Sequence, residues 1–268
     1  MGVKLNIVSD LHDPKDIDFS KFNYDADYIV IAGDSEECLT KIQDEKTRRK
    51  SKLNMIFTYG NHDLFTSYKL IRKNYEGYPT QFQSVEFGGG KETFKYIGTY
   101  KIKYEEHNIV FITAPLLSLV PTDTKLCKKL GDYEFFKTLF PYESDNTTIL
   151  RFNNLWNTKF IDDLTCIEAF VRETIEKEKN SKIILVTHGI PSFKLIENSI
   201  VYGSQLNIYW ASDKCLFNNI FPHCSLWIHG HSHEFCDMMI DNTRCIRNPL
   251  RDYNMQIIPE AYSYTIEV

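Results

Sequence analysis

The sequence lacks the cysteine pattern of a disulfide framework or of a zinc finger. Its seven cysteines form no C-x-x-C pair and are irregularly spaced, at positions 38, 127, 166, 215, 224, 236 and 245. An odd number of scattered cysteines favours reduced thiols, as found in a reducing compartment. We therefore expect none of them to be a nucleophile or a metal ligand.

Long hydrophobic segments and an excess of basic charge are also absent. No apolar run approaches the roughly 18 residues of a membrane span, and residues 1–11 carry no long apolar stretch of the signal-peptide kind. The 31 lysines and arginines are outnumbered by 36 acidic residues, for a net charge of −5. This balance does not favour a general binder of duplex nucleic acid. We expect a cytoplasmic protein with no membrane partner.

The chain does have enough apolar residues for one large core. It has 268 residues, of which 43% are hydrophobic, and it contains no internal repeat, low-complexity segment or linker. We therefore expect a single domain over residues 1–268. The segment around residues 115–150, with Pro121, Gly131 and Pro141, is predicted to be an irregular insertion. Its position suggests a lid or a specificity region, with a plain surface excursion as an equal alternative.

The predicted secondary structure mixes strands and helices. Apolar runs predict buried strands at residues 4–9, 28–32, 54–59, 182–187 and 226–228. Composition and periodicity predict helices at 36–52, 151–180 and 212–219, the last with Ser212 as N-cap. A strand pair is expected at 95–104 and 108–114, a hairpin at 235–240 and 244–247, and a final strand at 262–268. Residues 88–90 (GGG) predict a flexible loop and not a phosphate cradle, because no helix signal follows them.

Each of the buried strands leads into polar residues of metal-binding type. In chain order these residues are Asp10, His12, Asp34, Asn61, His62, His188, His231 and His233. Ligand sites in open α/β sheets lie at the carboxyl ends of strands, so we expect these side chains to gather there. In an extended backbone, residues one apart face the same way, as would Asp10 with His12 and His231 with His233. The donors are too many for one ion and suit two ions of the Mn, Fe, Ni or Zn type better than Mg or Ca.

These residues fall in five motifs. They are D-x-H (Asp10, His12), G-D (Gly33, Asp34), G-N-H-D (residues 60–63), a single histidine after a strand (His188) and G-H-x-H (residues 230–233). In this order, and over nearly the whole chain, they resemble the signature of calcineurin-like metallophosphoesterases. The resemblance implies an α/β fold, namely a four-layer αββα sandwich of two mixed β-sheets flanked by helices.

The resemblance also implies a role for each residue. One metal ion would take Asp10, His12, Asp34 and His233, and the other would take Asp34, Asn61, His188 and His231, with Asp34 as the bridge. His62, left without a metal, would be the general acid that protonates the leaving alkoxide. Asp63 could accept a hydrogen bond from the His62 ring and orient it, or could simply start a helix. His229 has no place in this scheme and would support a ligand or fill the core.

The chemistry that the resemblance implies is hydrolysis of a phosphate ester. Two cations roughly 3.5–4 Å apart share a water, lower its pKa and clamp the phosphoryl oxygens for in-line attack. We expect a small substrate, preferably a phosphodiester or a nucleotide-like phosphate, attacked by a metal-bridging hydroxide. Mn²⁺ is the favoured ion, with Fe, Ni or Zn as alternatives. The walls of the substrate pocket are expected from residues 115–145 and 202–210.

A narrower resemblance concerns residues 187–192 and 227–249, which look like a little-characterised cytoplasmic branch of predicted phosphohydrolases. That branch often has a second histidine after the strand-end histidine, where this chain has Gly189. It also tends to have Gly-Tyr after Asn-Pro, where this chain has residues 250–253 (LRDY). These departures leave the proposed ligands intact but leave the substrate open.

Two other functions remain as alternatives. A non-catalytic, metal-stabilised protein-binding module on the same fold would have no need for His62 beside a full ligand set. A nuclease of the same fold could be guided to nucleic acid by the basic residues of 46–52. Such an enzyme is expected to bind its substrate with a stripe of interleaved basic and aromatic residues, and the sequence has no such stripe. The sequence favours the phosphoesterase over both.

Overall fold

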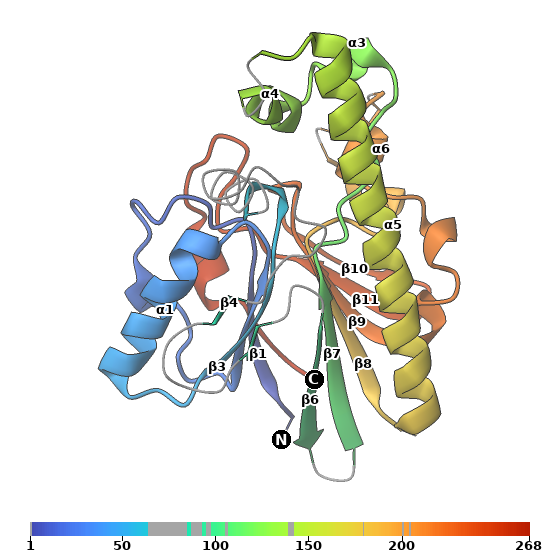
Figure 1. Ribbon diagram of the computed structural model, residues 1–268. Helices are drawn as coiled ribbons and strands as arrows, with labels where there is room; N and C mark the ends of the chain where they lie inside the picture. Colours follow the sequence, from blue (N-terminus) through green and yellow to red (C-terminus); the bar gives the residue numbers. More distant parts are fainter. Residues whose placement is uncertain are drawn as a thin grey trace.

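Two β-sheets packed face to face form the centre of the molecule (Figure 1). This computed structural model describes residues 2–63, 85–86, 93–94, 98–104, 107–138, 142–178, 180–199, 201–203 and 205–268. The loop predicted at residues 88–90 and the first part of the strand predicted at 95–104 lie outside these residues.

The strand order is β12-β1-β2-β3 in the first sheet and β10-β11-β9-β8-β7-β6 in the second. The first sheet contains β1 (Lys4–Val8), β2 (Tyr28–Ala32), β3 (Asn54–Thr58) and β12 (Thr265–Glu267). The second contains β6 (Gly98–Tyr104), β7 (His107–Ala114), β8 (Lys182–Thr187), β9 (Cys224–His229), β10 (Cys236–Ile240) and β11 (Thr243–Arg247). A separate small ladder pairs β4 (Val85–Glu86) with β5 (Thr93–Phe94).

Both main sheets are mixed, as predicted. β1, β2 and β3 run parallel, and so do β7, β8, β9 and β11. β12, β6 and β10 are antiparallel to their neighbours at or near the sheet edges. The predicted hairpin, formed by β10 and β11, and the predicted pairing of β6 with β7 are therefore confirmed.

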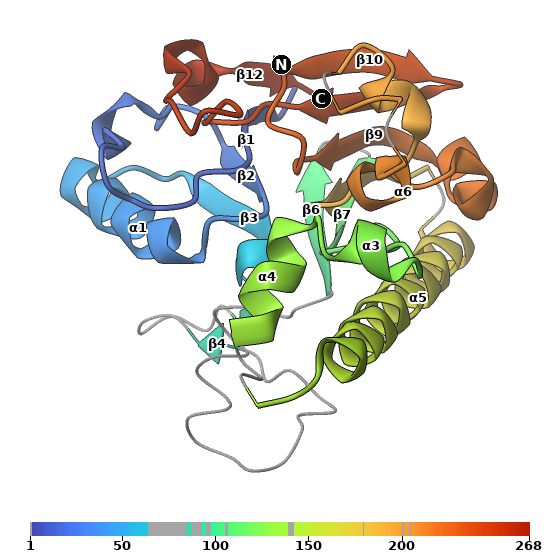
Figure 2. The same ribbon diagram turned by 90° about the horizontal axis from the view of Figure 1, so that it is seen from above.

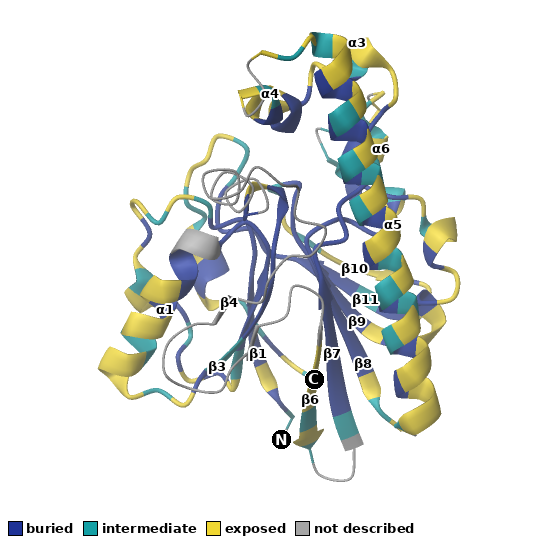
Figure 3. Cartoon of the chain, viewed as in Figure 1, coloured by how far each residue is buried: buried dark blue, intermediate teal, exposed yellow. Residues whose placement is uncertain are grey.

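Both faces of the central strands are buried, which explains their unbroken apolar runs. In β8, Ile184 and Val186 belong to the core between the sheets, while Ile183 and Leu185 belong to the core on the opposite face. All four side chains are at most 3% exposed. Burial of each such side chain contributes about 1.5–3 kcal/mol to folding. Figure 3 shows this buried centre between the more exposed helices.

One long helix covers the outer face of each sheet. α1 (Glu36–Arg49) lies against the first sheet and α5 (Asp145–Lys177) against the second (Figure 1; Figure 2). This confirms the predicted four-layer αββα arrangement. α1 ends before the predicted residue 52, because Lys50 takes a left-handed conformation (φ 55°) as its C-cap.

α5 is longer than predicted and extends beyond the sheet that it covers. It begins at Asp145 instead of residue 151, because Ser144 caps it by accepting a hydrogen bond from the backbone N–H of Thr147. Its 33 residues span about 50 Å, whereas the six residues of β8 span about 20 Å. The N-terminal half of α5 therefore projects past the carboxyl ends of the strands (Figure 1).

The insertion predicted around residues 115–150 packs on this projecting half. The prediction that it is irregular is wrong in part, because it contains α3 (Thr124–Cys127) and α4 (Gly131–Thr138). Aromatic contacts hold α4 to α5, with the Phe136 and Phe152 ring centroids 5.3 Å apart and those of Tyr133 and Phe152 5.9 Å apart. α4 is thereby placed above the strand ends (Figure 2).

The structure corrects two further predictions. The helix expected at residues 212–219 is the shorter 3-10 helix η3 (Lys214–Phe217), and Asp213 caps it by accepting from the backbone N–H of Cys215. Ser212 is therefore not the cap; its own N–H donates to the carbonyl of Ile190 at 2.9 Å. The final strand is only β12, because the 3-10 helix η5 (Pro259–Ser263) precedes it.

Short helices lie elsewhere in the described chain. They are α6 (Asn207–Trp210) and the 3-10 helices η1 (Phe19–Lys21), η2 (Phe193–Ile196) and η4 (Phe221–His223). No helix in the described ranges has both the length and the hydrophobicity to cross a membrane. The seven cysteines are free, as predicted, and burial raises the pKa of Cys127 to about 11 and that of Cys224 to about 12, so these two thiols stay protonated near neutral pH.

Candidate metal centre

The predicted strand-end residues gather at one edge of the two sheets. Hydrogen bonds join the loops that follow the strands: the N–H of His12 donates to the carbonyl of Asp34 (2.7 Å). In the same way, the N–H of Gly230 donates to the carbonyl of His188 (3.0 Å). The structure thereby brings together all eight side chains, Asp10, His12, Asp34, Asn61, His62, His188, His231 and His233.

A first group of donor atoms comes from the loops after β1 and β9. Asp10, His12 and His233 each offer one ligand atom within 4.8 Å of the others. The Nε2 atoms of His12 and His233 lie 3.1 Å apart, and His233 Nε2 lies 3.8 Å from Asp10 Oδ1. These three residues could hold one metal ion.

A second group lies on the other side of Asp34. Asp34 Oδ2 is 3.3 Å from His188 Nε2 and 3.8 Å from His12 Nε2, so this carboxylate reaches both groups. Asn61 Oδ1 lies 2.8 Å from His188 Nε2. The His231 ring centroid is 5.1 Å from that of His188, which places His231 at the rim of the second group.

The hydrogen bonds of three rings show which nitrogen of each ring is the donor. His188 Nδ1 lies 2.9 Å from Ala32 O, and His233 Nδ1 lies 3.0 Å from Arg251 O. His231 Nε2 lies 3.3 Å from the carbonyl of Tyr209. Since a carbonyl only accepts, each of these nitrogens is the donor, and in the neutral form of each ring the other nitrogen carries the lone pair.

The donor set therefore fits divalent cations. In the neutral ring, the lone pair at Nε2 of His188 points at another acceptor, Asn61 Oδ1. Such contacts between acceptors are unfavourable unless a proton or a cation lies between them. Nitrogen and carboxylate donors in this mixture suit ions of the Mn, Fe or Zn type, and a carbonyl bonded to the far ring nitrogen is the usual support of a ligating histidine.

The charges of the centre also favour a cation. Burial by itself raises the pKa of Asp34, but His188 and His62 outweigh it and hold this pKa well below its usual value. Burial lowers the pKa of His188, and the Asp34 carboxylate more than reverses this, raising it to about 10. Burial lowers the pKa of His12 to about 4 and that of His231 to about 3. These two rings are thus neutral near pH 7, which is the form that binds metals.

The backbone of the site is not extended, so the conformation predicted for Asp10 with His12 and for His231 with His233 is wrong, although Asp10 and His12 do lie in one group of donor atoms. All four take positive φ angles, of 52°, 54°, 82° and 52° respectively, and Asp34 does so as well, at 53°. A non-glycine residue in this region costs on the order of 1–3 kcal/mol, and such residues cluster at functional sites. The left-handed turns fold the loops back, and this folding brings the side chains to the centre.

His62 and Asp63 stand beside the two groups. The N–H of His62 donates to Asp34 Oδ1 (2.9 Å), and its exposed ring meets the His12 ring edge-on at 4.8 Å. Partial desolvation lowers the pKa of His62, but the carboxylates of Asp34 and Asp132 outweigh it and raise this pKa. Asp63 is buried and accepts from the N–H groups of Ser35 (2.9 Å) and Gly60 (2.8 Å). Its predicted hydrogen bond to the His62 ring stays a prediction.

Two residues at the centre were not predicted, Asp132 of α4 and Tyr209 of α6. Asp132 accepts from Nδ2 of Asn61 at 3.0 Å and also from the hydroxyl of Tyr209. Neither residue belongs to a motif. The only signal in the sequence was that their segments, 115–145 and 202–210, were expected to form the pocket walls.

A cavity of about 520 Å³ opens beside His62, and these two segments do line it. The described residues on its walls are His62, Lys129, Leu130, Gly131, Asp132, Phe135, Leu206, Tyr209 and Trp210. Aromatic and aliphatic side chains form most of this wall, while Lys129 and Asp132 add charge. The cavity therefore lies between the insertion and the metal centre.

The structure also describes two residues that the sequence left outside the ligand set, Gly189 and His229. Gly189 is required by packing, because a Cβ at this position would lie 1.7 Å from the carbonyl oxygen of Leu116; a histidine would not fit. His229 is fully buried in β9, where it pairs with Arg247 of β11. Its ring nitrogens have no hydrogen-bond partner among the described residues, so it fills the core.

Gly60 is the glycine on which the centre depends most closely. A Cβ at this position would lie 2.0 Å from Asp34 Oδ1, which is far below van der Waals contact. We expect Gly60→Ala to displace the Asp34 carboxylate and to weaken Mn²⁺ binding by at least about 10-fold, the lower range for losing support of a ligand. Isothermal titration calorimetry measures this. Gly131→Ala, whose Cβ would meet nothing within 4 Å, is the control; equal affinities in the two variants would contradict the expectation.

Several solved structures are similar to this chain at low sequence identity. The chain is similar to the phosphopantetheinyl hydrolase of Mycobacterium tuberculosis, with 16% identity and a TM-score of 0.54, covering 100% of this chain and 97% of that one. It is also similar to a suspected 5′-nucleotidase of Staphylococcus aureus, with 14% identity and a TM-score of 0.46, covering 92% of this chain and 48% of that one. The chain thus spans about half the length of the S. aureus protein.

A third similar structure is the GAP50 anchor of the inner membrane complex of Plasmodium, with 12% identity and a TM-score of 0.47, covering 92% of this chain and 71% of that one. No match was found among curated proteins. The family model of the calcineurin-like phosphoesterases matches residues 3–235, nearly the whole chain. The chain belongs to the calcineurin-like phosphoesterase family.

Proposed function

We propose that the protein is a two-metal phosphoesterase that acts on a small phosphodiester or nucleotide-like phosphate. The observation that carries the proposal is the position of Asp34, whose carboxylate lies within 3.8 Å of His12 and 3.3 Å of His188, one in each donor group. The first ion would take Asp10, His12, Asp34 and His233, and the second would take Asp34, Asn61, His188 and His231. Two divalent ions held in this way supply an activated water and a clamp for the phosphoryl oxygens. Mn²⁺ is the proposed ion.

His62 is proposed as the general acid for the leaving alkoxide. Its ring is exposed at the wall of the cavity, while the carboxylates of Asp34 and Asp132 raise its pKa. A histidine in this state holds a proton that it can give up near neutral pH. Asp63 is proposed to position His62. Its carboxylate accepts hydrogen bonds from the N–H groups of Gly60 and Ser35 and so holds the turn on which His62 lies.

The insertion around residues 115–150 is proposed as the specificity region. The leaving group would occupy the cavity, because the residue that protonates it forms part of the wall. Phe135 and Trp210 offer aromatic faces there on which a planar group can stack. Lys129, exposed on the same wall, offers a positive charge to a further anionic group. These features favour a nucleotide-like substrate over a small alkyl monoester.

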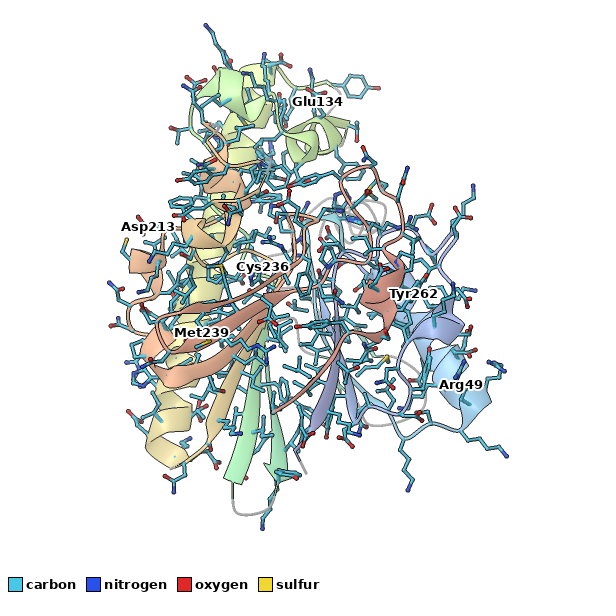
Figure 4. The ribbon with its side chains drawn as sticks, turned by 180° about the vertical axis from the view of Figure 1, so that it is seen from behind. Arg49, Glu134, Asp213, Cys236, Met239 and Tyr262 are labelled. Carbon is cyan, nitrogen blue, oxygen red and sulfur yellow. The ribbon has the colours of Figure 1, made fainter. Side chains whose placement is uncertain are left out.

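The position of the basic residues argues against the nuclease alternative. Arg49, Lys50 and Lys52 line a cavity with Val3 and Asn54, next to the amino ends of β1 and β3. The metal centre lies at the carboxyl ends of the same strands. Figure 4 shows Arg49 on α1 far from Glu134 on α4. The basic residues are therefore badly placed to guide a nucleic acid to the centre.

The proposed location in the cytoplasm rests on the free cysteines, which suit a reducing compartment.

A panel of phosphate esters with Mn²⁺, Ni²⁺ and Zn²⁺ tests the proposed function. We expect Mn²⁺ to support turnover of bis-p-nitrophenyl phosphate and of a nucleotide phosphodiester, and we expect EDTA to abolish it until metal is restored. The Asp34→Asn variant serves as the blank for contaminating phosphatases. Failure to hydrolyse any diester or monoester with all three ions would contradict the proposal. Inactivity together with tight capture of a partner protein would favour the binding-module alternative.

A further inference from the structure

Asp132 belongs to the insertion, and its side chain contacts a proposed metal ligand directly. Its side chain is only 4% exposed, although it begins a surface helix, α4. Both of its carboxylate oxygens face the side-chain amide of Asn61, at 3.0 Å and 3.2 Å from Nδ2. A buried carboxylate in this position needs such donors, because leaving it unpaired would cost several kcal/mol.

This contact determines which way the Asn61 amide points. The carboxylate oxygens of Asp132 accept, so the nitrogen end of the amide must face them. The oxygen end, Oδ1, is then directed to the opposite side, where it lies 2.8 Å from His188 Nε2. With the amide reversed, its oxygen would lie against two carboxylate oxygens and its NH₂ group would point at the centre. Divalent cations take the oxygen of an amide as ligand and not the nitrogen.

Tyr209 connects the same contact to a second ligand. Its hydroxyl donates to Asp132 Oδ2, and its backbone carbonyl accepts from Nε2 of the His231 ring at 3.3 Å. The Tyr209 and His231 ring centroids are 5.1 Å apart, so the side chain also packs on the ring that its carbonyl orients. Tyr209 is itself only 6% exposed.

We propose that Asp132 and Tyr209 are positioning residues for the second metal ion, through Asn61 and His231. The inference rests on the proposed function, which assigns these two ligands to that ion. The first ion's own ligands, His12 and His233, contact neither residue in the described hydrogen bonds. Asp132 and Tyr209 also line the cavity. The proposed pocket for the leaving group and the proposed site of the second ion therefore share these two residues.

The test is a Mn²⁺ titration of the metal-free protein, in which binding is measured by calorimetry and by electron paramagnetic resonance. In Asp132→Ala we expect the affinity for the second ion to fall about 10–100-fold, the range for losing a residue that orients a ligand. The affinity for the first ion should stay within about 3-fold of wild type, since context alone changes such values by that much. The Mn²⁺ concentration that half-saturates hydrolysis should rise together with the second dissociation constant, and kcat at saturating Mn²⁺ should fall less.

Two further variants separate positioning from packing. Tyr209→Phe removes only the hydroxyl and keeps the carbonyl that holds His231, so we expect a smaller loss than in Asp132→Ala. Asp132→Asn keeps one oxygen that can accept from Asn61 and should restore most of the affinity. Tyr133→Phe is the matched control, because the Tyr133 hydroxyl is buried in the same helix and has no hydrogen-bond partner among the described residues. It should bind both ions as wild type does.

The outcomes are distinct. If Asp132→Ala and Tyr209→Phe bind the second ion like wild type, or weaken both ions equally, the positioning role is wrong while the two-metal assignment stands. If the wild-type protein itself binds fewer than two ions, the proposed function is wrong at its base. Melting temperatures in EDTA show whether a variant is folded before metal is added, so a loss of fold is not mistaken for a loss of positioning.

Discussion

Asp34→Asn should remove tight binding of both metal ions and lower kcat/KM by about 10²–10⁴-fold. The Asp34 carboxylate lies within reach of both donor groups, at 3.8 Å from His12 Nε2 and 3.3 Å from His188 Nε2. An amide has the same shape but no negative charge and only one oxygen to share. Metal stabilisation of the transition state is worth several kcal/mol, and each 1.36 kcal/mol is tenfold in rate.

The experiment combines metal analysis with kinetics. Metal content after dialysis against Mn²⁺ and the rate with bis-p-nitrophenyl phosphate are measured for Asp34→Asn and for Asp44→Asn, whose side chain is exposed on α1. Melting temperatures in EDTA establish that both variants are folded. Retention of two tightly bound ions by Asp34→Asn would show that this carboxylate is not the bridge.

His62→Ala should have the second largest effect, and it should leave the metal in place. A general acid contributes about 10²–10⁴-fold to the rate, and His62 is the histidine of the cavity wall. Loss of this proton donor should matter most for a leaving group that needs protonation. We therefore expect the larger loss of kcat with an alkyl or nucleoside leaving group and the smaller loss with p-nitrophenolate, which leaves readily without a proton.

The control for this variant is His223→Ala, which removes an exposed histidine of η4 away from the centre. Both variants should bind Mn²⁺ with wild-type stoichiometry. Full activity of His62→Ala with an alkyl or nucleoside leaving group would show that His62 is not the general acid. Loss of a metal ion instead would point to a ligand role, which the proximity of His62 to His12 and Asp34 also permits.

The positions of the candidate site residues followed from the sequence because two simple patterns coincide. Apolar runs such as residues 28–32 and 182–187 are those of strands buried on both faces, and they agree with β2 and β8 to the residue. In a parallel sheet the carboxyl ends of such strands meet at one edge, so polar residues directly after them must converge. Asp34 and His188 follow strands of different sheets, and they lie 3.3 Å apart because the two sheets pack with the carboxyl ends of these strands on the same side.

Local conformation at the site could not be predicted in the same way. Asp10, His12 and the paired histidines of the last motif take left-handed conformations, which are uncommon for any residue other than glycine. Such angles persist only where surrounding contacts impose them. One such contact is the bond from the N–H of His231 to Asp10 Oδ1 at 3.0 Å, which joins residues at opposite ends of the chain. A periodicity argument assumes a regular backbone, and the backbone at these residues is not regular.

By itself, the sequence determined the strands and the acids and histidines that follow each of them, because each of these depends on residues that are neighbours in the chain. The packing of the two sheets brings the strand ends of both to one place. Only the tertiary structure decided that residues 131–138 form a helix over the centre and that Asp132 and Tyr209 contact Asn61 and His231. Those contacts join segments with no motif and no periodicity in common. They arise because α5 is long enough to carry the insertion past the strand ends, where aromatic packing of α4 on Phe152 sets its position.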